Sequence, residues 1–184
     1  RYGTKDDYLA GVKAARAAGL QIYADVVFNH KMGGDAEEEF EVIPFDPNDR
    51  NRPLGDARTI KSWTRFDFPG RGDKYSSMKW HWWHFDSVDY NSYDPGYHAV
   101  YRMKDKNFAD KVDLHSGNYD FLMGCDLDMN HPEVRGELKY WGEWILDTVG
   151  VDGFRLDAIK HIQGDFFSDW LDHLEAKAGR DLFT

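Results

Sequence analysis

The chain has 184 residues, with 41% hydrophobic and 16% aromatic side chains, and its formal net charge is -10 at pH 7. This composition supports one substantial globular domain and excludes a disordered chain. The excess of carboxylates argues against nucleic acid as a partner, and no apolar run approaches the roughly 18 residues that a transmembrane helix needs.

A helix followed by a buried strand is predicted at the start of the chain. Thr4 and Asp7 form the pattern of a capping box, and apolar residues then recur at helical spacing until Gly19 ends the helix. Residues 20–28 follow as an almost unbroken apolar run. Such a run is typical of a strand that is buried on both faces.

The same order of elements recurs near the end of the chain. Asn130 can cap a helix that has Pro132 in its first turn and ends at Gly150. Residues 151–157 are the next predicted strand, a further helix ends near Gly179, and another strand begins in the last four residues, so we expect a piece of a larger protein. The repetition of helix, glycine turn and buried strand is typical of a parallel α/β fold.

About 100 residues without a helical period separate these two units, and an ordinary loop is never that long. Prolines and glycines are frequent there, which predicts an irregular or β-rich inserted domain. We therefore divide the chain into a barrel segment (1–30), an inserted domain (31–130) and a second barrel segment (131–184). Functional residues of parallel barrels gather on the loops after the strands, so the insert should form one wall of a site.

Arg155 and Asp157 lie two positions apart at the end of the predicted strand 151–157. Because successive side chains of a strand alternate between its faces, these two residues should be neighbours on one surface. A nearby cation keeps a carboxylate ionised, which suits a nucleophile that must be anionic near neutral pH. A structural ion pair is the alternative interpretation.

Two further groups of polar residues could belong to a site. Asn29 and His30 end the first predicted strand and should point in different directions, although such a pair also suits a simple turn. Asp120, Asp126 and Asp128 are close together in the sequence, and carboxylates this dense repel one another unless a cation lies among them. Ca²⁺ selects hard oxygen ligands of this kind. A solvated acidic loop remains the alternative.

Aromatic residues are concentrated late in the insert. They are Trp80, Trp82, Trp83, Phe85, Tyr90, Tyr93, Tyr97 and Tyr101. Aromatic faces can stack on sugar rings, but we expect most of these side chains to pack in a core. His81 and His84 have no cysteine partners and no second histidine pair, so a zinc site is not predicted. The single cysteine, Cys125, excludes an internal disulfide and is expected to be a buried thiol.

Three motifs together resemble the α-amylase family of glycoside hydrolases, especially its bacterial liquefying type. They are DVVFNH at residues 25–30, LMGCDLD at residues 122–128 and GFRLDAIKH at residues 153–161. The resemblance extends over essentially the whole chain. It implies the central part of a (β/α)₈ TIM barrel, from the helix before the third strand to the start of the fifth, with domain B inserted after the third strand.

The resemblance implies retaining endo-hydrolysis of α-1,4-glucosidic bonds in starch-like glucans. Asp157 resembles the nucleophile, and Arg155 the cation that keeps it ionised. His30 resembles the histidine that binds the sugar before the scissile bond, and Lys160 and His161 resemble residues that contact the glucan beyond it. The implied partner is thus an α-glucan polysaccharide or oligosaccharide.

The resemblance also implies one structural calcium ion where the barrel meets the insert. Its ligands would be Asn29, Asp120, Asp126 and the backbone carbonyl of His161, so that calcium couples the fold of the insert to the site. Asp86 and Asp128 match ligands of an additional metal cluster. Support for a second Ca²⁺ or a Na⁺ is incomplete, because other carboxylate positions of that cluster fall on Ala109 and Asn130.

The family places its acid/base glutamate, and an aspartate that stabilises the transition state, on later strands. Retaining hydrolysis needs two carboxylates about 5–5.5 Å apart, so we expect these 184 residues alone to be inactive. An exo-acting or transglycosylating relative is one alternative, and a non-catalytic module that binds calcium and glucan is another. We expect a secreted monomer, with a cytoplasmic location as the alternative.

Overall fold

The structure is a computed structural model that describes residues 3–184, so the first two residues of the predicted barrel segment 1–30 lie outside the described part. The α-helices are α1 (Lys5–Ala17), α2 (Pro132–Val149) and α3 (Gly164–Ala178). The strands are β1 (Tyr23–Val26), β2 (His30–Lys31), β3 (Ala36–Asp46), β4 (Asp49–Pro53), β5 (Arg58–Arg65), β6 (Phe85–Val88), β7 (Val100–Met103), β8 (Cys125–Leu127) and β9 (Gly153–Leu156). Three short 3₁₀ turns are η1 (Trp82–His84), η2 (His115–Gly117) and η3 (Ile159–His161).

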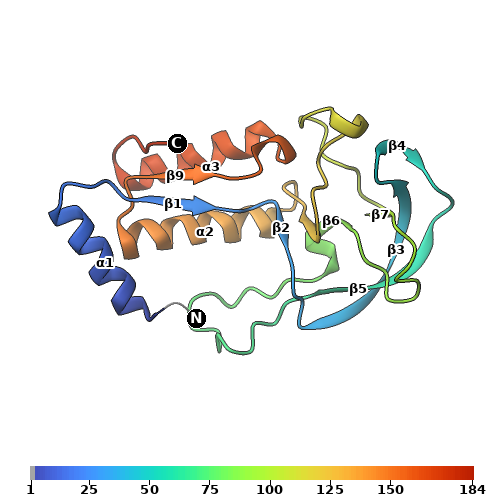
Figure 1. Cartoon of the computed structure of the whole chain (residues 1–184), viewed down its shortest axis with the longest axis horizontal. Coiled ribbons are helices and arrows are strands. Elements are labelled where there is room, and N and C mark those ends of the chain that lie inside the picture. Colours follow the sequence, from blue (N-terminus) through green and yellow to red (C-terminus); the bar gives the residue numbers. More distant parts are fainter. Residues whose placement is uncertain (1–2) are drawn as a thin grey trace.

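Two regions are distinct in the molecule (Figure 1). The helices gather around the parallel pair β1–β9 at one end, and the remaining strands form a seven-stranded sheet at the other. The order in this sheet is β2-β8-β6-β7-β3-β4, with β5 paired to β3, and all its pairs are antiparallel. The predicted combination of parallel α/β elements with a β-rich insert is therefore confirmed.

The helices begin and end close to the predicted residues. Thr4 caps α1 through the expected reciprocal hydrogen bonds with Asp7. For α2 the predicted cap is wrong by one residue: His131 is the N-cap, and its side chain makes no capping hydrogen bond. The amide oxygen of Asn130 instead accepts a hydrogen bond from Gln163 Nε2 at 3.0 Å. With Pro132 in the first turn, one backbone donor fewer needs a cap, which makes a weak cap tolerable.

The first strand is shorter and less buried than predicted. The apolar run 20–28 yields only the four residues of β1, of which Tyr23 is exposed and Val26 is buried. Within the described residues β9 is the only partner strand of β1, so one edge of β1 has no neighbouring strand to cover it. The continuous apolar pattern of residues 20–28 is typical of a strand with neighbours on both sides, and among the described residues β1 has a neighbouring strand on one side only.

Aromatic side chains hold the helices to the strand pair. Phe28 contacts Trp141 and Trp170 edge-on, with ring centroids 5.6 and 5.0 Å apart, and Phe154 contacts Trp170 at 4.9 Å. The buried indole of Trp170 donates to the Leu138 carbonyl at 2.9 Å, which ties α3 to α2. Neither these helices nor any other described helix is both long and apolar enough to cross a membrane.

The seven-stranded sheet has its own aromatic core. Trp80, Phe85 and Tyr101 are buried, as expected of packing residues, whereas Trp83 and Tyr93 lie at the surface. Cys125 is also buried, and its thiol donates to the Trp63 carbonyl. The chain passes from the barrel region into this sheet at β2 and returns after β8, and β2 and β8 are hydrogen-bonded neighbours. Both crossing points therefore meet at one junction.

Candidate active site and metal centre

The carboxyl ends of β1 and β9 bring three charged side chains together. In the parallel register, Asp25 lies opposite Arg155. Arg155 Nη1 donates to Asp25 Oδ1 at 2.7 Å, and Arg155 Nη2 lies 3.0 Å from Asp157 Oδ1. The backbone N–H of Asp157 also donates to the Val26 carbonyl at 2.9 Å, which fixes the residue against β1. One guanidinium thus orients two carboxylates at the rim of the strand pair.

This rim is open to solvent. The side chains of Arg155 and Asp25 are both 63% exposed, and that of Asp157 is 35% exposed. The pKa of Arg155 is raised first by its hydrogen bond to Asp25 and then by the charges of Asp25 and Asp157. Asp25 was not predicted as a site residue, although it begins the DVVFNH motif. Only the register between two strands about 130 positions apart reveals it, and no single strand pattern carries that register.

His30 lies near this rim from the side of the insert. Burial lowers the pKa of its imidazole, and the charge of Asp157 is the largest influence in the opposite direction. Its Nδ1 atom is buried and has no hydrogen-bond partner. Because Nδ1 is closed to solvent, Nε2 is the ring nitrogen that can exchange a hydrogen bond with a sugar hydroxyl. His30 is therefore suited to the role that its motif predicts.

Lys160 and His161 follow the rim on η3. Lys160 is exposed, and its backbone carbonyl accepts a hydrogen bond from the Asp113 N–H at 3.0 Å. His161 is buried, and its Nδ1–H donates to the Tyr119 carbonyl at 2.5 Å. These two contacts dock a loop of the insert onto η3. His161 thereby lies beside the residue that precedes Asp120.

A second group of carboxylates lies at the junction between barrel and insert. Asp86, Asp120 and Asp126 are buried, with 4%, 4% and 1% exposure, and one carboxylate oxygen from each lies within 4.8 Å of the others. They come from β6, from the loop before β8 and from β8. The β6–β8 register is irregular between Phe85 and Ser87, and this bulge at Asp86 allows its side chain to turn toward Asp126. Asp86 therefore lies beside two of the predicted calcium ligands, Asp120 and Asp126.

Among residues 3–184, no basic side chain lies within hydrogen-bond distance of these carboxylates. Burial and mutual repulsion raise the pKa of Asp86 and Asp126 well above the ordinary value, and burial raises the pKa of Asp120 to about 6. Asn29 is buried beside them: its amide donates to Asp126, whereas its Oδ1 atom is buried without a partner. An unpaired amide oxygen beside three buried carboxylates is the donor set that a hard divalent cation requires.

Asp128 is not one of the three clustered carboxylates. Its Oδ2 atom is 2.8 Å from Lys106 Nζ, and its Oδ1 atom accepts the Asn130 N–H at 2.9 Å. Of the two residues predicted for an additional metal, Asp86 thus lies with Asp120 and Asp126, and Asp128 has an ammonium partner; the additional metal stays a prediction.

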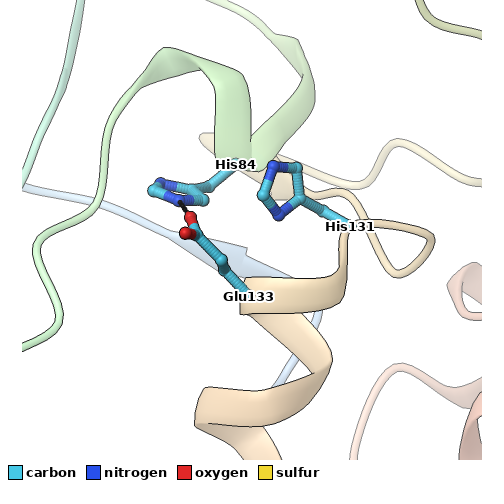
Figure 2. Close-up of side chains that lie close together, drawn as sticks. All are labelled: His84, His131 and Glu133. Carbon is cyan, nitrogen blue, oxygen red and sulfur yellow. Dashed lines mark hydrogen bonds and ion pairs between the residues drawn. The ribbon is translucent and has the colours of Figure 1, made fainter.

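His84 belongs to a different cluster, with His131 and Glu133 (Figure 2). One potential ligand atom from each lies within 4.8 Å of the others. His84 Nδ1 accepts the His81 N–H at 3.0 Å, so the proton of the neutral ring is on Nε2, and Nε2 donates to Glu133 Oε2 at 2.8 Å. A metal bound at Nε2 would shift the proton of the neutral ring to Nδ1. The Nδ1–H and the His81 N–H would then be two donors facing each other, and their hydrogen bond would be lost. The cluster is therefore a hydrogen-bonded link between η1 and the first turn of α2.

The parallel strand pair with its helices, followed by an inserted antiparallel sheet, matches part of a TIM barrel that carries an inserted domain. The family model described as "Alpha amylase, catalytic domain" matches residues 1–176. The chain belongs to this α-amylase family, as its motifs indicate.

Similar proteins agree with this assignment. An α-amylase from Geobacillus stearothermophilus is 50% identical over 186 residues, covering 100% of this chain and 34% of the relative. A glucan 1,4-alpha-maltohexaosidase from Bacillus sp. (strain 707) is 45% identical, covering 100% and 36%. The chain thus spans about a third of the length of these relatives. A solved α-amylase from Geobacillus thermoleovorans, complexed with acarbose, shares the fold with a TM-score of 0.50 at 20% identity, over 95% of this chain and 27% of that one.

Proposed function

We propose that the protein containing this chain hydrolyses α-1,4-glucosidic bonds within starch-like glucans, with retention of the anomeric configuration. The observation that carries the proposal is the guanidinium of Arg155, held between Asp25 and Asp157 at the carboxyl ends of two parallel barrel strands. The names of the two curated relatives, an α-amylase and a glucan 1,4-alpha-maltohexaosidase, support the same substrate class.

In this proposal Asp157 is the nucleophile. Its carboxylate attacks the anomeric carbon, the bond to the leaving oxygen breaks, and that oxygen takes a proton from the acid/base residue that the family places on a later strand. Water then cleaves the glycosyl ester and regenerates the carboxylate. Arg155 orients the Asp157 carboxylate, and His30 positions the sugar through Nε2.

Replacing Asp157 with Asn in the full-length protein tests this mechanism. The amide keeps the volume but cannot form the ester, so turnover should fall at least about 10³-fold, while the thermal midpoint changes little because the side chain is partly exposed. Asp172→Asn, on the exposed side of α3, is the matched control and should retain activity. A 5-fluoro-glycosyl fluoride should label the native protein on the peptide containing Asp157. Label on another carboxylate would contradict the assignment.

The proposal includes one calcium ion at the junction. Asn29, Asp86, Asp120 and Asp126 would hold it, with the backbone carbonyl of His161 as a further ligand. The buried carboxylates and the unpaired Asn29 oxygen support this site, and the contact of His161 with Tyr119 supports the fifth ligand. When bound, calcium supplies the positive charge that the carboxylates lack and connects the insert to the rim.

Endo-action is the preferred form of the activity. An exo-acting or transglycosylating enzyme, or a module that binds glucan and calcium without catalysis, would share this part of the barrel. The size distribution of products from a long maltooligosaccharide would distinguish the first two from an endo-acting enzyme, and absence of hydrolysis in the full-length protein would favour the module. Monomeric state and secretion stay predictions that gel filtration and fractionation of the culture would check.

A further inference from the structure

Lys106 occupies an unusual position beside the buried carboxylates. Its Nζ atom lies 2.8 Å from Asp128 Oδ2 and also donates to the Trp83 carbonyl at 2.5 Å. Both members of the ion pair are largely covered, with side chains 19% and 14% exposed. The nearby pair of Lys104 with Glu41 has a similar distance of 2.9 Å, but its side chains are 41% and 56% exposed. The charges of Lys106 and Asp128 are therefore less screened by solvent than those of Lys104 and Glu41, and their attraction is stronger.

Both carboxylate oxygens of Asp128 have a partner in this arrangement. Lys106 takes one oxygen, and the Asn130 N–H takes the other at 2.9 Å. The backbone N–H of Asp128 donates to the His84 carbonyl at 3.0 Å, which fixes the residue against η1. Among the described residues, neither group of three potential metal ligands includes Asp128.

The remaining positions of the additional metal cluster do not fit a cation either. Ala109 has no side-chain donor, its carbonyl accepts from Asn118 Nδ2 at 2.6 Å, and its N–H donates to Asp120 Oδ2 at 2.7 Å. The amide oxygen of Asn130 accepts from Gln163. At these two positions a side-chain donor is therefore missing at Ala109, and the amide oxygen of Asn130 is engaged within the protein.

We propose that the Lys106 ammonium is the second cation of this junction, so that the junction binds one divalent ion and not two. This inference rests on the proposed calcium site, whose carboxylates lie next to the pair. The positive charge of Lys106 acts on Asp86 as well as on Asp128. Because this charge is covalently attached, it cannot dissociate, and part of the junction should stay ordered when calcium is removed.

Calcium counting on the full-length protein tests the first half of the proposal. Protein saturated with calcium and freed of excess ions is measured by plasma mass spectrometry for wild type, Asp126→Asn and Asp128→Asn. Asp126→Asn should lose one equivalent, and Asp128→Asn should lose none. Loss of an equivalent in Asp128→Asn would overturn the inference while leaving the first site intact. No loss in Asp126→Asn would instead contradict the calcium site of the proposed function.

Thermal unfolding in a chelator tests the second half without depending on calcium. Lys106→Met should lower the midpoint at least about three times as much as Lys104→Met, since it leaves a covered carboxylate unpaired. Asp128→Asn added to Lys106→Met should recover most of that loss, because it removes the unpaired charge. Equal shifts for the two lysine variants, or strictly additive losses in the double variant, would overturn the role of Lys106.

Discussion

The carboxylates at the rim of the strand pair and those at the junction with the insert differ in solvent exposure and in their positively charged partners. At the rim, Asp25 and Asp157 share the guanidinium of Arg155 and are partly solvated. At the junction, Asp86, Asp120 and Asp126 are buried, and within the described residues no basic side chain lies within hydrogen-bond distance of them. The rim therefore has its counter-charge built in, whereas the counter-charge of the junction is the proposed calcium ion.

This difference separates the two contributions that carboxylates can make. A solvated carboxylate beside a fixed cation stays ionised at little cost to folding, which suits a group that must react. Buried carboxylates without a partner destabilise the fold until a cation binds, which suits a group that must connect two regions. Changes at the rim should consequently alter turnover, and changes at the junction should alter stability.

Calcium removal should produce the largest effect on stability. If the ion is present at about 1,000 times its dissociation constant, its removal costs about 4 kcal/mol of unfolding free energy. Differential scanning calorimetry of the full-length protein with calcium and with a chelator would measure the shift. In Asp126→Asn the chelator should have little further effect. An equal response of wild type and variant would mean that the stabilising ion binds elsewhere.

Replacement of Arg155 should reduce turnover strongly and change thermal stability little, which is the opposite of the effect of calcium removal. Arg155→Met removes the cation that orients Asp157, so we expect turnover to fall roughly 10²–10³-fold, equivalent to about 3–4 kcal/mol of transition-state stabilisation. The thermal midpoint should barely change, because exposed ion pairs add little to stability. Arg65→Met is a matched control, because its partner Asp67 is 34% exposed and thus similar to Asp157. A large loss of stability in Arg155→Met would break the distinction between rim and junction.

Local patterns in the sequence were sufficient for the elements and for part of the rim. Alternation along a strand placed Arg155 beside Asp157, and the capping box placed the start of α1. Asp25 was missed because its contact with Arg155 depends on the register of two strands far apart in the sequence. β1 is more exposed than predicted because the apolar run predicts a strand covered on both sides, whereas β9 is its only partner strand within the described residues.

The junction was predictable only in part for the same reason. The DLD and NYD segments indicated a cluster of oxygen donors, but Asp86 comes from a strand that pairs with β8 through an irregular register. Sequence comparison therefore grouped Asp86 with Asp128, whereas the fold groups it with Asp120 and Asp126. The partner of Asp128, Lys106, lies 22 positions away in a segment without periodicity, and no local pattern indicates that pair.

The smallest predicted effect is the pH dependence of the metal-free protein. Folding raises the pKa of Asp120 to about 6, and those of Asp86 and Asp126 well above the ordinary value of 3.8, so the folded state binds more protons than the unfolded state above about pH 4. In a chelator, the free energy of unfolding should thus fall as pH rises through these values. Calcium opposes this loss because it compensates the ionised carboxylates. The difference between the thermal midpoints measured with calcium and with chelator should therefore increase from pH 5 to pH 7.

In Asp120→Asn this difference should increase less with pH. A difference that does not depend on pH would show that these carboxylates do not bind the ion.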